Sequence, residues 1–167
     1  MQAYFLTLAG YNEWANKRLY DAVGSLDAAA IVAPRIGFFP SLLKTLNHLV
    51  VTDRIWLSRL TGVADPEMKA LDQIVGDDFA DLRRQREALD LRIKTYVAEM
   101  PPARFGEILV YKTMAGAPYE TPVRFVLAHM FNHQTHHRGQ AHGMLSGTDV
   151  PPPSLDMIVY LREAGIS

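Results

Sequence analysis

The residues with the clearest chemical potential in this sequence are its histidines. Four of the six stand within nine residues, in the segment HMFNHQTHH, and they are His129, His133, His136 and His137. A helix advances about 100° per residue, so His133 and His137 project side by side from one helix face. That spacing allows two imidazoles of one helix to share a metal ion. The segment therefore predicts part of a metal site.

The helix face that carries this pair is mostly apolar. The residues within about 60° of His133 on that face include Val126, Met130, Gln140 and Met144. The pair is therefore expected to point into the protein. Buried imidazoles need polar partners, which a metal ion or hydrogen bonds within the core would supply. A metal ion needs at least three protein ligands as a rule, so the pair requires a third.

His48 is the one histidine outside this helix, and by elimination it is the third ligand of any three-histidine site. Its position in the periodic pattern leaves two interpretations open. A stripe of large apolar residues runs along the surrounding segment, and His48 falls on the opposite, more polar side. Either the stripe faces another helix or a partner subunit while His48 faces a cleft, or His48 is a surface histidine. This leucine stripe consists of Leu42, Leu46, Leu49, Trp56 and Leu60.

The remaining histidines have weaker claims on the site. His136 lies about 60° from His133 on the other flank of the face, so it competes with His137 for the ligand role. His129 stands one turn before His133, and it is a candidate fourth ligand or a hydrogen-bond donor to a ligand. His142 points away from this face and is expected to be exposed.

Composition and charge narrow the classes of function. The chain of 167 residues has 17 basic and 18 acidic residues and no cysteine. The lack of a basic excess argues against a nucleic-acid binder. The lack of cysteine excludes disulfides, cysteine-ligated metals and a protein thiol nucleophile. With no signal-peptide pattern and no apolar run of about 20 residues, we expect a cytoplasmic protein that does not enter a membrane.

Helical periodicity dominates the chain and predicts a single all-α domain over residues 1–167. Four long amphipathic helices are expected to form a four-helix bundle, with a crossover or short hairpin before the fourth helix and a short C-terminal helix. Thr121 is the expected N-cap of the fourth helix, with Pro122 at its first position. The predicted elements are helices at about 3–24, 41–60, 77–99 and 121–145, a hairpin or crossover within 105–119, and a helix at 155–163.

Two arginines stand out against these patterns. Arg86 interrupts the apolar stripe of the third predicted helix, so we expect its aliphatic stem to pack while its charged head reaches solvent. Arg138 lies off the histidine face. We expect it to form a structural salt bridge with an acid of a neighbouring helix.

Several motifs together resemble a known family. The segment NHQTHHRGQ, residues 132–140, is similar to the HxxxHRGQ signature of the DinB family of metal-binding bundles. The resemblance covers nearly the whole chain, although its other motifs are less specific. These are YNEWAN at 11–16, LNHL at 46–49, DRIW at 53–56, the pair Pro151-Pro152, and Asp156.

The resemblance implies a fold and a set of ligands. Members of the family are four-helix bundles and often homodimers, and one histidine of the second helix and two of the fourth hold their metal. Carried over residue by residue, these positions match His48, His133 and His137. The resemblance thus favours His48 as a ligand and prefers His137 to His136. Some relatives are transferases or isomerases that use a low-molecular-weight thiol. The family name refers to induction by DNA damage and does not imply DNA binding.

A site of three neutral imidazoles suggests a mechanism. It leaves at least one coordination position open, and the ion keeps its full charge, so it acidifies a bound water or thiol. Since the chain has no cysteine, the thiol must come from outside. We therefore expect one divalent ion, with zinc or nickel favoured over iron or manganese, that activates a small thiol or water for transfer to a small electrophile. The candidate supporting residues are Gln140, Asn47, Tyr11 and Trp14.

Other functions compete with this one. The chain could be a metal-binding protein without catalysis, or a dimeric stress-response or interaction module whose interface is the leucine stripe. A di-iron carboxylate bundle is disfavoured, because that chemistry uses Glu-x-x-His pairs and no glutamate stands three residues before any histidine here.

Overall fold

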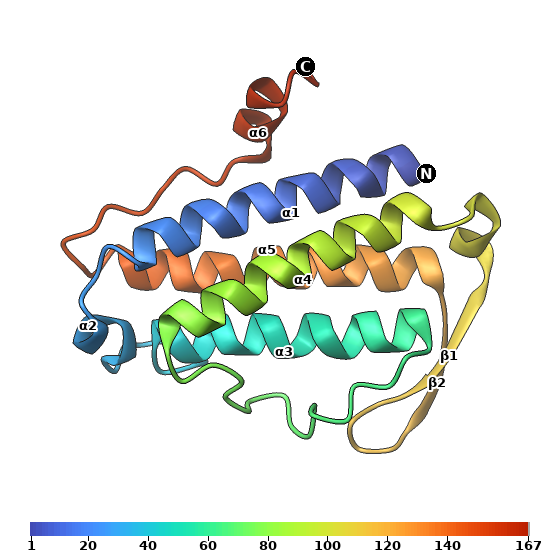
Figure 1. The fold of residues 1–167 in the computed structure, drawn as a ribbon, viewed down its shortest axis with the longest axis horizontal. Coiled ribbons are helices and arrows are strands. Elements are labelled where there is room, and N and C mark those ends of the chain that lie inside the picture. The colour runs from blue at the N-terminus through green and yellow to red at the C-terminus, as the bar shows by residue number, and fades with distance from the viewer. Residues whose placement is uncertain (167) are drawn as a thin grey trace.

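The computed structural model describes residues 1–166. The chain is mostly helical, and its four long helices lie side by side with one small two-stranded sheet at one end (Figure 1). In the direction of the chain, α3 and α4 run one way and α1 and α5 run the other. The long helices are α1 (Gln2–Val23), α3 (Leu42–Thr61), α4 (Phe79–Glu99) and α5 (Val123–Leu145).

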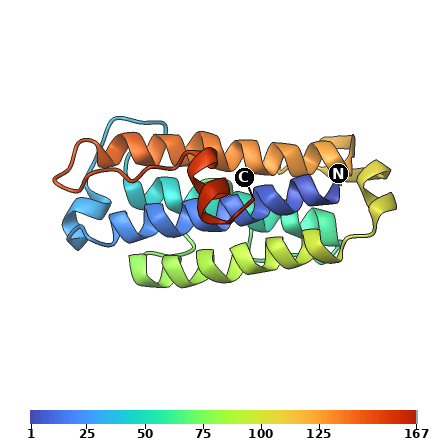
Figure 2. The same cartoon turned by 90° about the horizontal axis from the view of Figure 1, so that it is seen from above.

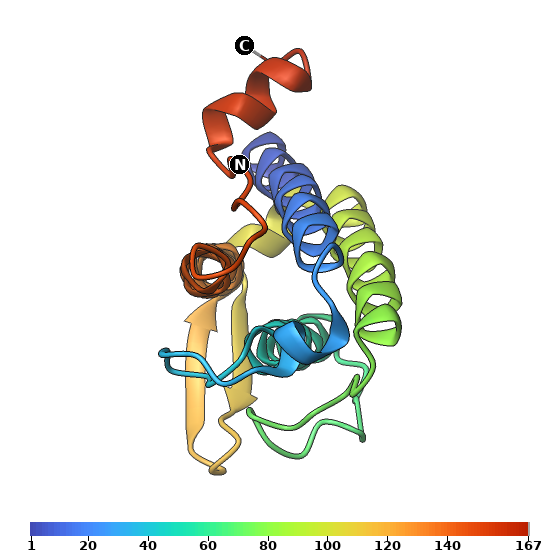
Figure 3. The ribbon, with the colours of Figure 1, turned by 90° about the vertical axis from the view of Figure 1, so that its left-hand side faces the viewer.

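The order of the helices around the bundle is visible in the end-on view (Figure 3). Helix α1 packs against α4 and α5, and α3 packs against the same two helices, so α1 and α3 lie diagonally opposite. Because α3 and α4 are parallel, the chain between them, residues 62–78, must return along the length of the bundle. The sequence pattern predicted a crossover only before the fourth helix, and this second one was missed. This crossover covers the side of α3 that carries His48.

The predicted boundaries of α3 are confirmed by its caps. The Ser41 hydroxyl accepts a hydrogen bond from the Lys44 amide at 3.2 Å. At the other end, Gly62 adopts a left-handed conformation with φ 73°, which ends the helix because glycine has no Cβ to clash. In the next long helix, Asp78 caps α4 through the Ala80 amide. These caps are local interactions, and the two ends of α3 were predicted from local sequence, whereas the Asp78 cap was not.

The segment before α5 forms a short hairpin, which is one of the two alternatives that the sequence predicted there. After a 3-10 helix, η1 (Pro102–Gly106), strand β1 (Ile108–Lys112) pairs in antiparallel register with β2 (Pro118–Pro122). The predicted start of the fourth helix was one residue too early, because Thr121 and Pro122 pair with β1. Pro122 is the N-cap of α5, and Val123 is its first residue. The hairpin contacts both α3 and α5.

Two short helices complete the chain. The sequence pattern did not predict α2 (Ala28–Val32), which follows α1. Helix α6 (Met157–Glu163) lies on the outer side of α1, as the view from above shows (Figure 2). Gly10 of α1 makes that contact possible, because a Cβ at this position would collide with the Tyr160 hydroxyl. Among residues 1–166, none of the helices is both long and apolar enough to cross a membrane.

A buried polar network ties the four long helices together, and it corrects the prediction for Arg86. The Arg86 side chain is 1% exposed, and it pairs with Asp53 and Asp90 at 2.8 Å each. Its head therefore lies in the interior and not in solvent, because two carboxylates meet it there. Sequence periodicity could not reveal this, since Asp53 belongs to another helix. Such a pair is costly to break, because the remaining charges are left buried without a partner.

Arg138 of α5 belongs to the same network, and its prediction also needs correction. No acid of residues 1–166 forms a salt bridge with it, and its guanidinium donates instead to the amide oxygens of Asn12 and Asn16. The amide nitrogens of these two asparagines donate in turn to Asp90. The two neutral amides thus connect the buried Arg138 guanidinium to the buried Asp90 carboxylate through hydrogen bonds.

The leucine stripe of α3 lies inside the molecule. Leu42, Leu46 and Leu49 are 0% exposed and Leu60 is 2% exposed, all within the central core of the chain. The proposed use of this stripe as a dimer interface is therefore wrong. The stripe faces other helices of the same chain, which was one of the two interpretations that its periodicity left open.

Candidate metal centre

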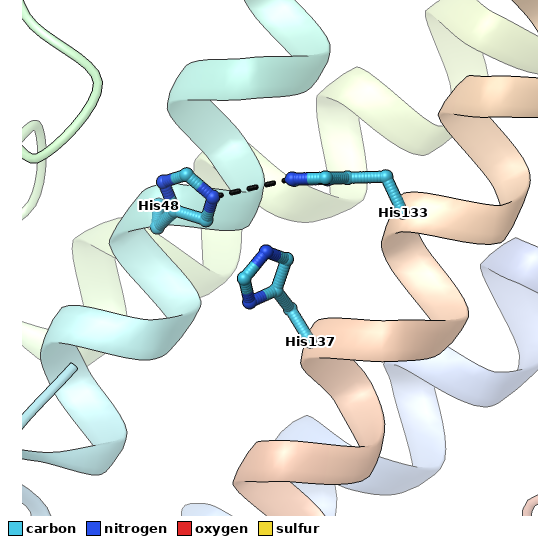
Figure 4. Close-up of side chains that lie close together, drawn as sticks. All are labelled: His48, His133 and His137. Atoms are coloured by element: carbon cyan, nitrogen blue, oxygen red, sulfur yellow. Dashed lines mark hydrogen bonds between the residues drawn. The ribbon is translucent and has the colours of Figure 1, made fainter. Parts of the chain in front are cut away.

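Three histidines from two helices converge at one point of the bundle. His48 of α3 points toward His133 and His137 of α5 (Figure 4). Each offers one ring nitrogen, and these three nitrogens lie within 4.8 Å of one another. His48 and His137 are each 7% exposed, and His133 is half-buried. The cleft interpretation of His48 therefore agrees with the structure.

The crossover between α3 and α4 explains why His48 is buried on a face that looked polar. Its carbonyl at Leu71 accepts a hydrogen bond from His48 Nδ1 at 2.8 Å. Asn47, the neighbour of His48, clamps the same crossover. Its Oδ1 accepts from the amides of Val75 and Gly76 at 2.7 and 2.9 Å, and its Nδ2 donates to the Gly76 carbonyl at 2.8 Å. Asn47 thus affects the site by holding the crossover whose Leu71 carbonyl orients His48. Its own side-chain oxygen and nitrogen are both used in these hydrogen bonds.

The hydrogen bonds at Nδ1 decide which nitrogen faces the centre. A carbonyl oxygen only accepts, so the proton of His48 resides on Nδ1 and its Nε2 carries the lone pair. His137 has the same arrangement, because its Nδ1 lies 2.7 Å from Oε1 of Gln140. The amide nitrogen of Gln140 faces His136 Nε2 at 3.2 Å, which agrees with this orientation of the amide. Outer partners of this kind are typical of metal-bound imidazoles.

The spacing of the nitrogens fits a divalent ion. His48 Nε2 and His133 Nε2 are 3.3 Å apart. A tetrahedral ion with metal–nitrogen bonds of 2.0–2.1 Å would hold two ligand nitrogens about 3.3 Å apart. Two facing lone pairs at this distance repel each other unless a proton or a cation lies between them. The donor set is therefore compatible with a bound cation.

Burial keeps the three imidazoles neutral, which is the form that binds metal. Desolvation, together with the neighbouring imidazoles of His137 and His48, lowers the pKa of His133 to about 3. Burial likewise lowers the pKa of His48 and that of His137. Protons therefore compete poorly for these nitrogens near neutral pH.

The other histidines lie outside this set. The ring of His129 is partly exposed and lies 5.2 Å from that of Trp56 and 5.6 Å from that of His133, measured between centroids. His136 is exposed and contacts Gln140. His142 is half-buried, contrary to the prediction, because its Nε2 donates to the Pro153 carbonyl at 2.9 Å and so anchors the chain that leads to α6.

Two predicted supporting residues are far from this chemistry. The Tyr11 hydroxyl donates to the Leu155 carbonyl at 2.7 Å, and Trp14 donates to Glu163 at 2.8 Å. Tyr11 therefore attaches the segment before α6 to α1, Trp14 attaches α6 itself, and neither side chain lines a cavity next to the three histidines. Gln140, in contrast, is placed where the sequence predicted, on the histidine face and in contact with His137.

Two cavities reach the three histidines. One, of about 710 Å³, is lined by His137 and Gln140 together with the loop before α3. The other, of about 530 Å³, is lined by His133 and the hairpin. His48 and Leu71 line both cavities and form the wall between them. The centre is therefore accessible from two sides.

Two contributors to the site were not found from sequence. Phe39 packs its ring on His48, with centroids 4.3 Å apart, and it comes from a segment that was predicted only as a loop. Leu71 contributes a main-chain carbonyl. A carbonyl has no side-chain signature, so only the course of the backbone could reveal its role.

Comparison with known proteins identifies the family of this chain. The sequence profile of the DinB family matches residues 1–166. The chain belongs to the DinB family. It is also 25% identical to Protein DinB of Bacillus subtilis (strain 168) over 164 residues, which are 96% of this chain and 95% of that protein. The resemblance drawn from the segment NHQTHHRGQ, residues 132–140, is thus confirmed, and in this DinB-family chain that segment carries two of the three converging histidines, His133 and His137.

Proposed function

We propose that this DinB-family protein binds one divalent metal ion through His48, His133 and His137 and is a metal-dependent enzyme. Its reaction would be transfer of a low-molecular-weight thiol, or of water, to a small electrophile. The observation that carries the proposal is the convergence of three imidazole nitrogens within 4.8 Å between two cavities. A site that only stabilised the fold would have no need of access from two sides.

The donor set supports a particular group of metals. Three neutral imidazole nitrogens without a carboxylate suit zinc or nickel, and they suit manganese less well because it prefers oxygen ligands. Three protein ligands leave a position open for a small molecule, which is typical of catalytic sites. When bound, such an ion supplies a positive charge that acidifies a thiol or a water in contact with it.

The protein's own residues hold and shield this site. The Leu71 carbonyl and the Gln140 amide fix the orientation of two imidazoles. Phe39 covers His48 from one side. Because the chain has no cysteine, the reacting sulfur must belong to a cosubstrate. In the transfer, this sulfur forms a bond to carbon of the electrophile while the bond from that carbon to its leaving group breaks. The thiol proton and the leaving group are released to solvent.

Metal content and turnover test the proposal together. Purified protein is stripped with a chelator, reloaded with zinc or nickel and measured by elemental analysis. The loaded protein then receives cysteine, glutathione or 2-mercaptoethanol with monochlorobimane, where the sulfur displaces chloride. We expect about one ion per chain and accelerated transfer with at least one thiol. His137→Ala should lose both, and His136→Ala, its exposed neighbour, should keep both.

Three results would change this conclusion. If the wild-type chain retains no ion after reloading, the metal site is wrong. If it binds one ion but transfers no thiol and hydrolyses no ester, it is a non-catalytic metal-binding protein. Equal losses in the His136 and His137 variants would show that the ligand set is misassigned.

The family resemblance also leads us to propose a homodimer. The leucine stripe is buried within one chain, so an interface must use another surface. Sedimentation velocity at micromolar concentration tests this, and a monomer there would contradict it.

A further inference from the structure

We infer that the cavity on the hairpin side is a binding site for a flat, apolar ligand that carries an anionic group. The inference rests on the proposed function only for the role of that ligand, as the electrophilic substrate. Binding itself needs no metal, because the groups that recognise the ligand are aromatic rings and an arginine of this cavity and not its histidines.

The walls of this hairpin cavity are aromatic. Trp56 of α3 and Tyr111 of β1 meet edge to face, with ring centroids 5.2 Å apart and planes at 70°. Tyr119 of β2 stacks beside Tyr111 at 6.1 Å and stands at the rim, where it is 53% exposed. Ile55 and Met114 add apolar surface to the lining. Aromatic faces of this kind favour planar ligands, because ring stacking adds to the apolar area that is buried.

One cation stands among these rings. The Arg59 guanidinium lies over the Trp56 ring at 4.5 Å and the Tyr111 ring at 5.0 Å, and it donates to the Lys112 carbonyl at 2.9 Å. Burial lowers its pKa, although an arginine remains charged at neutral pH. Its partly desolvated charge therefore lies against the apolar walls.

This charge has no anionic partner within the described chain. Among residues 1–166, no aspartate or glutamate forms a salt bridge with Arg59, and none lines the hairpin cavity. Arg54, five residues earlier on α3, differs, because Asp65 and Glu67 both pair with it. A partly buried guanidinium without a carboxylate is an attractive partner for a ligand carboxylate, which it can bind through two parallel hydrogen bonds.

The position of Arg59 also determines how the ligand lies between this arginine and the histidines. His48 and Arg59 are eleven residues apart on α3, roughly 16 Å along its axis at 1.5 Å per residue. The long Arg59 side chain places its guanidinium over the ring of Trp56, three residues earlier on the helix, which shortens this gap. An anion held at Arg59 therefore places its aromatic body against Trp56 and its far end toward His48 and His133, which line the same cavity.

The second cavity is then available to the cosubstrate. It shares only His48 and Leu71 with the hairpin cavity, and Lys44 and Gln140 line its other walls. Two molecules can therefore approach the three histidines through separate cavities that share few lining residues. The hairpin cavity selects the electrophile by shape and charge.

The test uses 4-(trifluoromethyl)cinnamate and its uncharged amide as probes, followed by ¹⁹F NMR on the full chain after metal removal. We expect the acid to bind at least tenfold more tightly than the amide. Arg59→Gln should remove this preference, while Arg92→Gln, a change at an exposed arginine of α4, should retain it. Trp56→Leu should weaken both probes. Tyr119→Leu, at the exposed rim, should weaken both with little risk to folding.

A further variant separates this inference from the proposed function. His137 does not line the hairpin cavity, so His137→Ala should lose the metal and still bind the acid. If the wild-type chain binds no metal but binds the acid through Arg59, the proposed function fails and the inference stands. Equal affinity for acid and amide, or unchanged affinity in the folded Arg59→Gln variant, would overturn it.

Discussion

Gln140→Leu is expected to weaken metal binding without unfolding the protein. Among residues 1–166, the Gln140 amide oxygen is the only hydrogen-bond acceptor for His137 Nδ1, at 2.7 Å. Leucine has a similar volume but no acceptor, so the imidazole loses the contact that fixes both its orientation and the nitrogen that carries the proton. Gln140 is half-buried at the edge of the first cavity, which leaves room for the apolar side chain.

The size of the effect follows from the hydrogen bond. A neutral bond of this kind contributes about 0.5–1.5 kcal/mol, which corresponds to a factor of about 2–12 in a dissociation constant. Loss of orientation adds to this, and outer partners of metal ligands are typically worth about 10–100-fold in affinity. We therefore expect the Kd for zinc to rise by about 10–100-fold in Gln140→Leu. Gln140→Glu, which offers a charged acceptor, should lower the Kd by about fivefold.

Competition against a chromogenic chelator at pH 7 measures these constants. Asn132→Leu is the matched control, because it also removes an amide from an exposed position of α5 and should leave the Kd unchanged. Thermal unfolding with and without zinc gives an independent reading, since binding favours the folded state. If Gln140→Leu and Gln140→Glu both bind zinc within twofold of wild type, Gln140 does not orient a metal ligand.

Three further predictions concern pH, stability and the crossover. The pKa of His133 is lowered to about 3 in the folded chain, so below about pH 6.5 only the unfolded state binds a proton at this imidazole. The metal-free chain should therefore lose stability as the pH falls below about 6.5. Thermal unfolding should show a weaker dependence on pH for His133→Gln. Arg86→Met leaves two buried aspartates without a cation and should cost about 3–5 kcal/mol in denaturant unfolding, whereas the exposed Arg84→Met should cost less than about 0.5 kcal/mol. Asn47→Ala releases the crossover, so hydrogen exchange there should accelerate and zinc affinity should fall, and an unchanged exchange rate would contradict the clamp.

Features that depend on neighbouring residues were accessible from the sequence. His133 and His137 share a face because they stand four residues apart on a helix, whatever the rest of the chain does. The caps at Ser41 and Gly62 are equally local, and both ends of α3 were predicted correctly. Thr121 and Pro122 show the limit of such reasoning, because pairing with β1 outweighs their local preference for a helix start.

Features that depend on distant segments were decided only by the tertiary structure. The direction of His48 was ambiguous because periodicity on α3 could not anticipate that residues 62–78 would return over its polar side. Arg86 resembled a surface residue for the same reason, since its partner Asp53 is 33 residues away. Side-chain spacing along one helix reports which residues share a face. Which chain segment covers that face depends on long-range packing, and in this protein that packing turns one histidine of α3 and two of α5 into a single site.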